Sequence, residues 1–169
     1  AEMTCAEHTA IHRFTFHGRE NPQLLVDFQS SLVGSEKQLY EHVLDAKVNF
    51  EGRTTITGYT RTQVWLDRTY YYVIEFSKPY ISKVELPKRQ GPEKAPRYVF
   101  SFDLKPDETL LVKVASSSTG IEGAKKNLQA EIALDGVVTM VPQNCRRHQH
   151  VVGQRKIQQP GTAQRTHDE

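Results

Sequence analysis

The fold of this chain is decided by residues 55–80, which read TITGYTRTQVWLDRTYYYVIEFSKPY. Two runs rich in Thr, Ile, Val, Tyr and Phe flank a short polar break at Asp67 and Arg68. β-Branched and aromatic residues suit a pleated, half-buried surface, and Asp beside Arg suits a turn. The second run alternates, with one face formed by Tyr71, Val73 and Glu75 and the other by Tyr72, Ile74 and Phe76. We predict an antiparallel hairpin that carries Trp65 near its tip, with the remaining β segments packed around it.

Further strand candidates lie on both sides of this hairpin. They are residues 2–8, 11–17, 23–28, 45–51, 83–86, 97–103 and 109–115. The Leu-Leu-Val run at 24–26 predicts a strand that is buried on both faces. Many short strands without long helices between them favour two packed antiparallel sheets. The predicted fold class is therefore mainly β, an antiparallel β-sandwich.

One short α-helix is predicted near residues 119–132. Thr119 and Glu122 have the spacing of a capping box, in which a hydroxyl and a carboxylate satisfy the first free amides of a helix. An apolar face at helical spacing follows, formed by Ile121, Ala124, Leu128 and Ile132.

The composition changes beyond residue 141. Residues 142–169 contain no aromatic side chain and are rich in Gln, Arg and His. Such a segment buries too little apolar area to offset its ordering entropy. We predict one partial β-sandwich domain over 1–141 and an unstructured or aberrant tail over 142–169. A frame-shifted, truncated or artificially joined end explains this tail better than a functional one.

The overall composition excludes several classes of protein. The 169 residues suffice for about one domain, and no apolar run is long enough to span a membrane. Residues 1–8 lack the basic start and apolar stretch of a signal peptide. The net charge is only +2, and five of the 22 Lys and Arg residues lie in the tail. We therefore expect no nucleic-acid partner and no membrane span.

Few residues in the sequence are candidates for catalysis, ligand binding or metal coordination. Trp65 could stack on a sugar from the hairpin tip or could be a core residue, and both interpretations remain open. His12, His148 and His150 do not form a supported metal-ligand set, so no metal site is predicted. Cys5 and Cys145 are expected to be thiols rather than a disulfide framework. The Asp and Glu residues form no spaced pair, so no catalytic residue is predicted.

Several ordered blocks point to one family. Residues 11–16 read IHRFTF, residues 24–31 read LLVDFQSS, and residues 110–132 read LLVKVASSSTGIEGAKKNLQAEI. With the TITGYTRTQVW and YYYVIEFSKPY blocks of the hairpin, they resemble the N-terminal β-sandwich domain of glycoside hydrolase family 92. These enzymes are bacterial, calcium-dependent exo-α-mannosidases. The resemblance covers residues 1–140, and the family places a Trp at a point similar to Trp65, usually after Gly rather than Val64.

The resemblance implies a function for the parent protein. It implies α-mannoside glycans as substrates, a periplasmic or secreted location, and a helical-barrel catalytic domain that carries the catalytic groups and the calcium. This chain would then be a non-catalytic part that supports the barrel and forms part of the mannose site, inactive alone. The alternatives are an independent carbohydrate-binding or interaction module, and a structural adhesion-type sandwich that binds no glycan.

Overall fold

The computed structural model describes residues 1–17, 21–29, 42–63, 66–87 and 95–131. Several sequence predictions lie outside these residues. They concern Trp65, Ile132, Cys145, His148, His150 and the segment 142–169.

The described residues form nine strands and one helix. The strands are β1 (Glu2–Cys5), β2 (Thr9–Thr15), β3 (Gln23–Asp27), β4 (His42–Glu51), β5 (Thr55–Gln63), β6 (Asp67–Phe76), β7 (Tyr80–Glu85), β8 (Arg97–Phe102) and β9 (Thr109–Ser117), and the helix is α1 (Ile121–Glu131).

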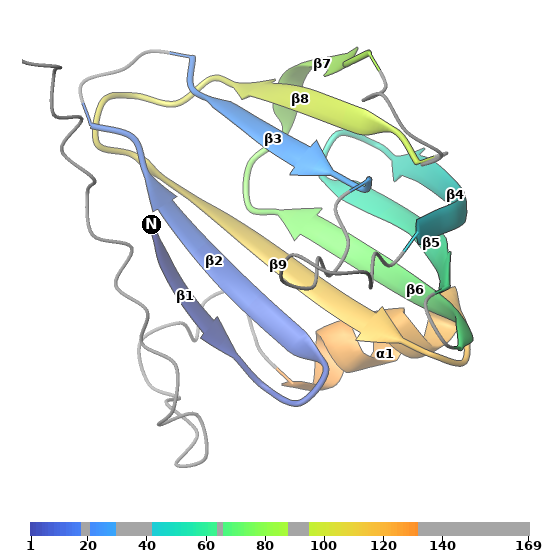
Figure 1. Ribbon diagram of the computed structural model, residues 1–169. Helices are drawn as coiled ribbons and strands as arrows, with labels where there is room; N and C mark the ends of the chain where they lie inside the picture. Colours follow the sequence, from blue (N-terminus) through green and yellow to red (C-terminus); the bar gives the residue numbers. More distant parts are fainter. Residues whose placement is uncertain (18–20, 30–41, 64–65, 88–94, 132–169) are drawn as a thin grey trace, which may run out of the picture.

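The strands build two antiparallel sheets that pack face to face (Figure 1). The larger sheet has six strands in the order β1-β2-β9-β6-β5-β4, and the smaller has three in the order β3-β8-β7. This arrangement confirms the predicted mainly-β sandwich with one short helix. The larger sheet is completed by the pairing of β9 with both β2 and β6, which joins segments far apart in the sequence.

The predicted central hairpin is formed by β5 and β6, which pair in register from Thr55 with Glu75 to Gln63 with Asp67. The predicted turn at Asp67 and Arg68 is wrong, because both residues lie in β6 and pair with β5. Their paired backbones extend the ladder, so β5 ends at Gln63 and β6 begins at Asp67. The predicted alternation is confirmed, since Tyr72, Ile74 and Phe76 belong to the main core.

The main core is a layer of aromatic and aliphatic side chains between the sheets. Phe100 of β8 is fully buried at its centre, where its ring lies 5.3 Å from that of Phe76 and 5.1 Å from that of Tyr80. At the rim, the Lys83 amine lies 3.2 Å from the centre of the Phe50 ring. This cation–π contact joins β7 to β4 and so closes one side of the sandwich.

One prediction for the smaller sheet is wrong. Leu25 of β3 is 47% exposed, although the apolar run at 24–26 suggested burial on both faces. Leu24 and Val26 pack against the core, while Leu25 faces the opposite way. A strand at the edge of a two-layer sandwich has only one covered face, so its side chains alternate between core and surface.

The helix α1 covers part of the outer face of the larger sheet (Figure 1). Its buried residues Ala124 and Leu128 pack with Val73 of β6 and Ala115 of β9, as the predicted apolar face requires. The helix begins at Ile121, and the amide of Ala124 donates to the carbonyl of Gly120. Gly120 therefore occupies the N-cap position instead of Thr119, whose hydroxyl lies 2.9 Å from that of Ser117.

Candidate functional site

Five side chains form a polar and aromatic surface beside the tip of the β5–β6 hairpin. We call it the hairpin surface, and its members are Asp45, Tyr59, Arg61, Asp67 and Tyr71. They come from β4, β5 and β6, three neighbouring strands of the larger sheet. Within each strand they alternate with side chains that face the core. The surface therefore lies on the same face of the sheet that α1 covers further along.

The hairpin surface is held by a short set of side-chain contacts. The Tyr59 hydroxyl donates a hydrogen bond of 2.9 Å to Oδ2 of Asp45. The Tyr59 and Tyr71 rings lie 6.0 Å apart, tilted by 57°. Arg61 Nε donates to both carboxylate oxygens of Asp67, at 2.8 and 3.0 Å, and Nη2 of Arg61 also contacts Oδ2. This forked contact orients the guanidinium as well as binding it.

The charges of this surface follow from the same contacts. The hydrogen bond between Arg61 and Asp67 lowers the pKa of the Asp67 carboxyl group. The same hydrogen bond raises the pKa of the Arg61 guanidinium. The hydrogen bond to Asp45 raises the pKa of Tyr59, because the bond stabilises the neutral phenol. At neutral pH the surface therefore presents a carboxylate, a guanidinium and a phenol that keeps its proton.

Such a surface can orient a polar ligand, but its shifted pKa values do not suit it to proton transfer at neutral pH. Aromatic rings and fixed polar groups are the usual means by which a protein orients a polar ligand. A carboxyl group acts as a general acid at neutral pH only when its pKa is raised. In the described ranges, each carboxyl group whose pKa clearly departs from normal has a lowered pKa, namely Asp67, Glu108 and Glu131.

The structure describes some of the site residues that the sequence suggested, but not all of them. Trp65 lies outside the described residues, but Gln63 ends β5 before it and Leu66, which is 67% exposed, follows it. His12 is half-buried in β2, where its ring stacks 6.0 Å from that of Phe14 and burial lowers its pKa. Over the described part of the chain, no three His, Cys, Asp or Glu side chains are grouped to hold a metal ion.

The hairpin surface was not predicted from the sequence. Tyr59 and Arg61 stand two residues apart in β5, so the alternation of that strand could have placed them on one face. Asp45 could not have been added from sequence, because its place beside Tyr59 and Arg61 depends on how β4 pairs with β5. The pattern of a single strand thus finds only part of this surface.

Comparison with known proteins now decides the family. The model of the glycosyl hydrolase family 92 N-terminal domain matches residues 1–117, from the first residue to the end of β9. The chain belongs to this family. A comparison with curated protein sequences gave no significant match.

Solved structures of family 92 proteins share the fold of this domain. The family GH92 α-mannosidase BT3965 from Bacteroides thetaiotaomicron, in complex with mannoimidazole, matches with a TM-score of 0.65 at 21% identity, over 80% of this chain and 19% of that one. The inverting mannosidase BT2199 of the same species matches with a TM-score of 0.60 at 17% identity, over 78% and 18%. The glycosyl hydrolase ccman5 gives a TM-score of 0.57 at 16% identity, over 80% and 18%.

These matches cover most of this chain but only a small part of each solved relative. The family 92 domain spans about a fifth of the length of the solved relatives that it matches. Within the described residues, no helix is both long and apolar enough to cross a membrane.

Proposed function

We propose that this family 92 domain is the non-catalytic N-terminal part of an α-mannosidase-like glycoside hydrolase. In the intact enzyme it supports a helical catalytic barrel and forms one wall of the mannose site. The observation that carries this proposal is the family match over residues 1–117, in a chain whose alignment covers only 19% of a solved relative. The substrates are α-mannoside glycans, and the parent enzyme is periplasmic or secreted.

The hairpin surface and Trp65 are our candidates for the wall of the mannose site. Tyr59 and Tyr71 offer ring faces, while Arg61 and Asp67 offer oriented donors and acceptors beside them. A sugar has both C–H-rich faces and hydroxyl groups, so it can contact both kinds of side chain. Trp65 follows the end of β5 by two residues and would add a larger ring.

In this proposal calcium binds elsewhere in the parent enzyme and not to this chain. Hard cations such as Ca²⁺ need six to eight oxygen ligands, several of them carboxylates. The described residues do not fit this requirement, because they show no group of three or more acidic, His or Cys side chains. We therefore assign no calcium ligand and no calcium-dependent step to this chain.

The chain alone is expected to show no turnover of aryl α-mannosides. Hydrolysis needs a positioned acid and an activated water, and the lowered pKa values of Asp67, Glu108 and Glu131 suit none of them to be the acid. The measurement is release of the aryl group by purified protein with calcium in excess, beside a chelated sample. Calcium-dependent release of mannose would contradict the proposal, because the chain would then contain the catalytic groups.

Binding of mannose to the chain alone is expected to be weak and confined to the hairpin. A two-dimensional NMR titration with methyl α-mannoside should move the amides of Tyr59, Arg61 and Tyr71 and the Trp65 indole, with a Kd of about 1 mM or weaker because one wall alone buries little of a ligand. Trp65→Ala should abolish these shifts, whereas Lys126→Ala on the exposed side of α1 should not. Micromolar affinity would instead support an independent carbohydrate-binding module. Complete absence of binding would support a structural sandwich.

A further inference from the structure

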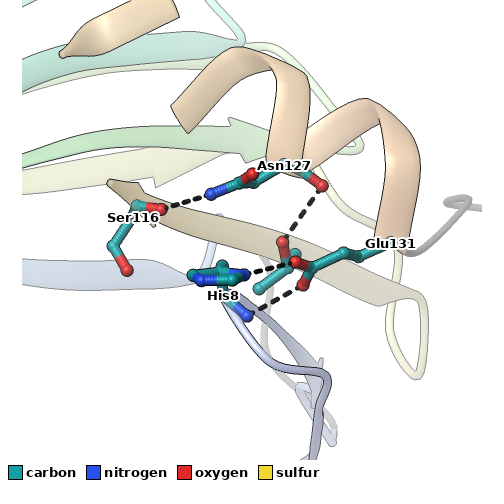
Figure 2. A network of polar contacts seen from close by, with 5 residues as sticks. His8, Ser116, Asn127 and Glu131 are labelled. Carbon is teal, nitrogen blue, oxygen red and sulfur yellow. Dashed lines mark hydrogen bonds and ion pairs between the residues drawn. The ribbon is translucent and has the colours of Figure 1, made fainter. Parts of the chain in front are cut away.

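The last turn of α1 is tied to the sandwich by a compact polar network (Figure 2). The Asn127 side chain donates 2.8 Å to the carbonyl of Ser116 in β9, and the Thr9 hydroxyl donates 3.3 Å to the carbonyl of Asn127. The Ser116 amide in turn donates 3.0 Å to the carbonyl of His8. The network therefore joins three elements, namely the helix, the end of β9 and the β1–β2 turn.

Glu131, the last residue of α1, makes the strongest contacts in this network. One carboxylate oxygen accepts 2.9 Å from the His8 amide, and the other accepts 2.8 Å from Nδ1 of the same residue. The two residues are 123 positions apart, and the Glu131 side chain is only 19% exposed. Hydrogen bonds to an ionised group are stronger than neutral ones, so this pair is the main attachment of the helix end.

A second charged pair lies beneath the helix on the same face. Lys113 of β9 is 4% exposed and stands opposite Glu75 of β6. Burial lowers the pKa of Lys113, and the negative charges of Glu75 and Glu131 oppose that shift. The titratable groups that face Glu131 are thus His8 on the turn and Lys113 on β9, with Glu75 beyond. Both near neighbours favour the ionised carboxylate.

We propose that Glu131 and His8 form an acid-released latch that fixes the C-terminal end of α1 on the sandwich. With the carboxylate ionised, both hydrogen bonds form and the helix end is held against the β1–β2 turn. With the carboxyl group protonated, one oxygen becomes a donor, the bonds from His8 lose their ionised acceptor, and the attraction between Glu131 and Lys113 is lost. The helix end then separates from the turn while the two sheets stay packed.

The direction of the pH dependence follows from the contacts. Partial burial raises the pKa of Glu131, but hydrogen bonds from the His8 amide and the His8 ring oppose it, and the net pKa lies below its usual 4.5. A depressed folded-state pKa gives stability that is present above the unfolded-state pKa. That stability is lost as the pH falls through the folded-state value. The latch is therefore closed at neutral pH and opens below the usual carboxyl range.

Amide hydrogen exchange of the whole chain tests this latch. At about pH 6, Glu131→Gln should lower the protection factors of the His8 and Leu128 amides about tenfold, because a charge-assisted contact is lost. Glu122→Gln is the matched control, since Glu122 lies on the same helix and is 84% exposed. Wild-type protein moved to about pH 3 should lose the same protection, while the Phe100 amide stays protected.

The outcomes separate the latch from general loosening of the fold. Unchanged protection at His8 and Leu128 in Glu131→Gln, or full protection in the wild type at about pH 3, would overturn the proposal. If Glu131→Gln also lowers the protection of the Phe100 amide, His8→Ala is the deciding variant. It removes the contact between the His8 ring and Glu131 but keeps the hydrogen bond from the backbone amide of residue 8. Partial loss of protection at Leu128 alone would then support the latch, and loss at every site would refute it.

Discussion

Replacement of Phe100 by alanine should lower the free energy of unfolding by about 3–5 kcal/mol. Phe100 is completely buried between the sheets, and its ring lies within 6.3 Å of those of Phe50, Phe76, Tyr80 and Tyr98. Truncation removes apolar contacts from strands of both sheets and leaves a cavity that packed rings cannot fill. Urea unfolding followed by circular dichroism measures this loss.

The matched control is Leu25→Ala on the neighbouring strand. Leu25 is 47% exposed and faces away from the core, so its truncation should cost no more than about 0.5–1 kcal/mol. A loss of that small size for Phe100→Ala would mean that the two sheets do not pack on its ring. Such a result would contradict the packing of the core around Phe100.

Replacement of Gly58 by alanine should be nearly as harmful, although it adds a single methyl group. A Cβ atom at this position would lie 1.9 Å from the carbonyl oxygen of Lys47 and 2.6 Å from the Tyr72 hydroxyl. That hydroxyl crosses Gly58 to donate 3.2 Å to the same carbonyl. The alanine must therefore push β4 away from β5 or break the Tyr72 contact. We expect a loss of roughly 3 kcal/mol, because overpacking against backbone cannot relax easily.

Calorimetry of the thermal transition measures this effect, with a fall in Tm of about 10 °C expected for Gly58→Ala. Gly52→Asn is the control, since Gly52 has a φ of 67° and nothing within 4 Å of the added Cβ. Asn tolerates this left-handed conformation better than other residues, so its Tm should change little. Equal losses in both variants would show that glycine flexibility, rather than the close strand approach, is what the fold requires.

Local patterns in the sequence determined much of this fold. The alternation of Tyr72, Ile74 and Phe76 identified the core face of β6, because a strand turns successive side chains to opposite sides. The helical spacing of Ala124 and Leu128 identified the buried face of α1 for a similar reason. The sequence blocks also indicated family 92, which the match over residues 1–117 confirmed.

Other features needed the tertiary structure. Periodicity shows which side of a strand is apolar, but it does not show which strand lies beside it or how many layers cover it. The burial of Leu25 was therefore predicted wrongly, and the turn at Asp67 was misplaced. The close approach at Gly58 depends on two neighbouring strands, so a glycine in the sequence could not reveal it.

The candidate sites also divide into features that the sequence displays and features that only the tertiary structure reveals. Trp65 was found by its residue type and its place near the hairpin tip, both of which a sequence displays. The contact of Tyr59 with Asp45 depends on the register of β4 against β5. The contact of His8 with Glu131 joins residues 123 positions apart. Such pairs form only when distant strands and the helix pack together, because the free energy that selects their pairing comes from burial of the whole core. The sequence alone thus determined the strands, the helix and the family, whereas the packed sheets decided which polar groups meet.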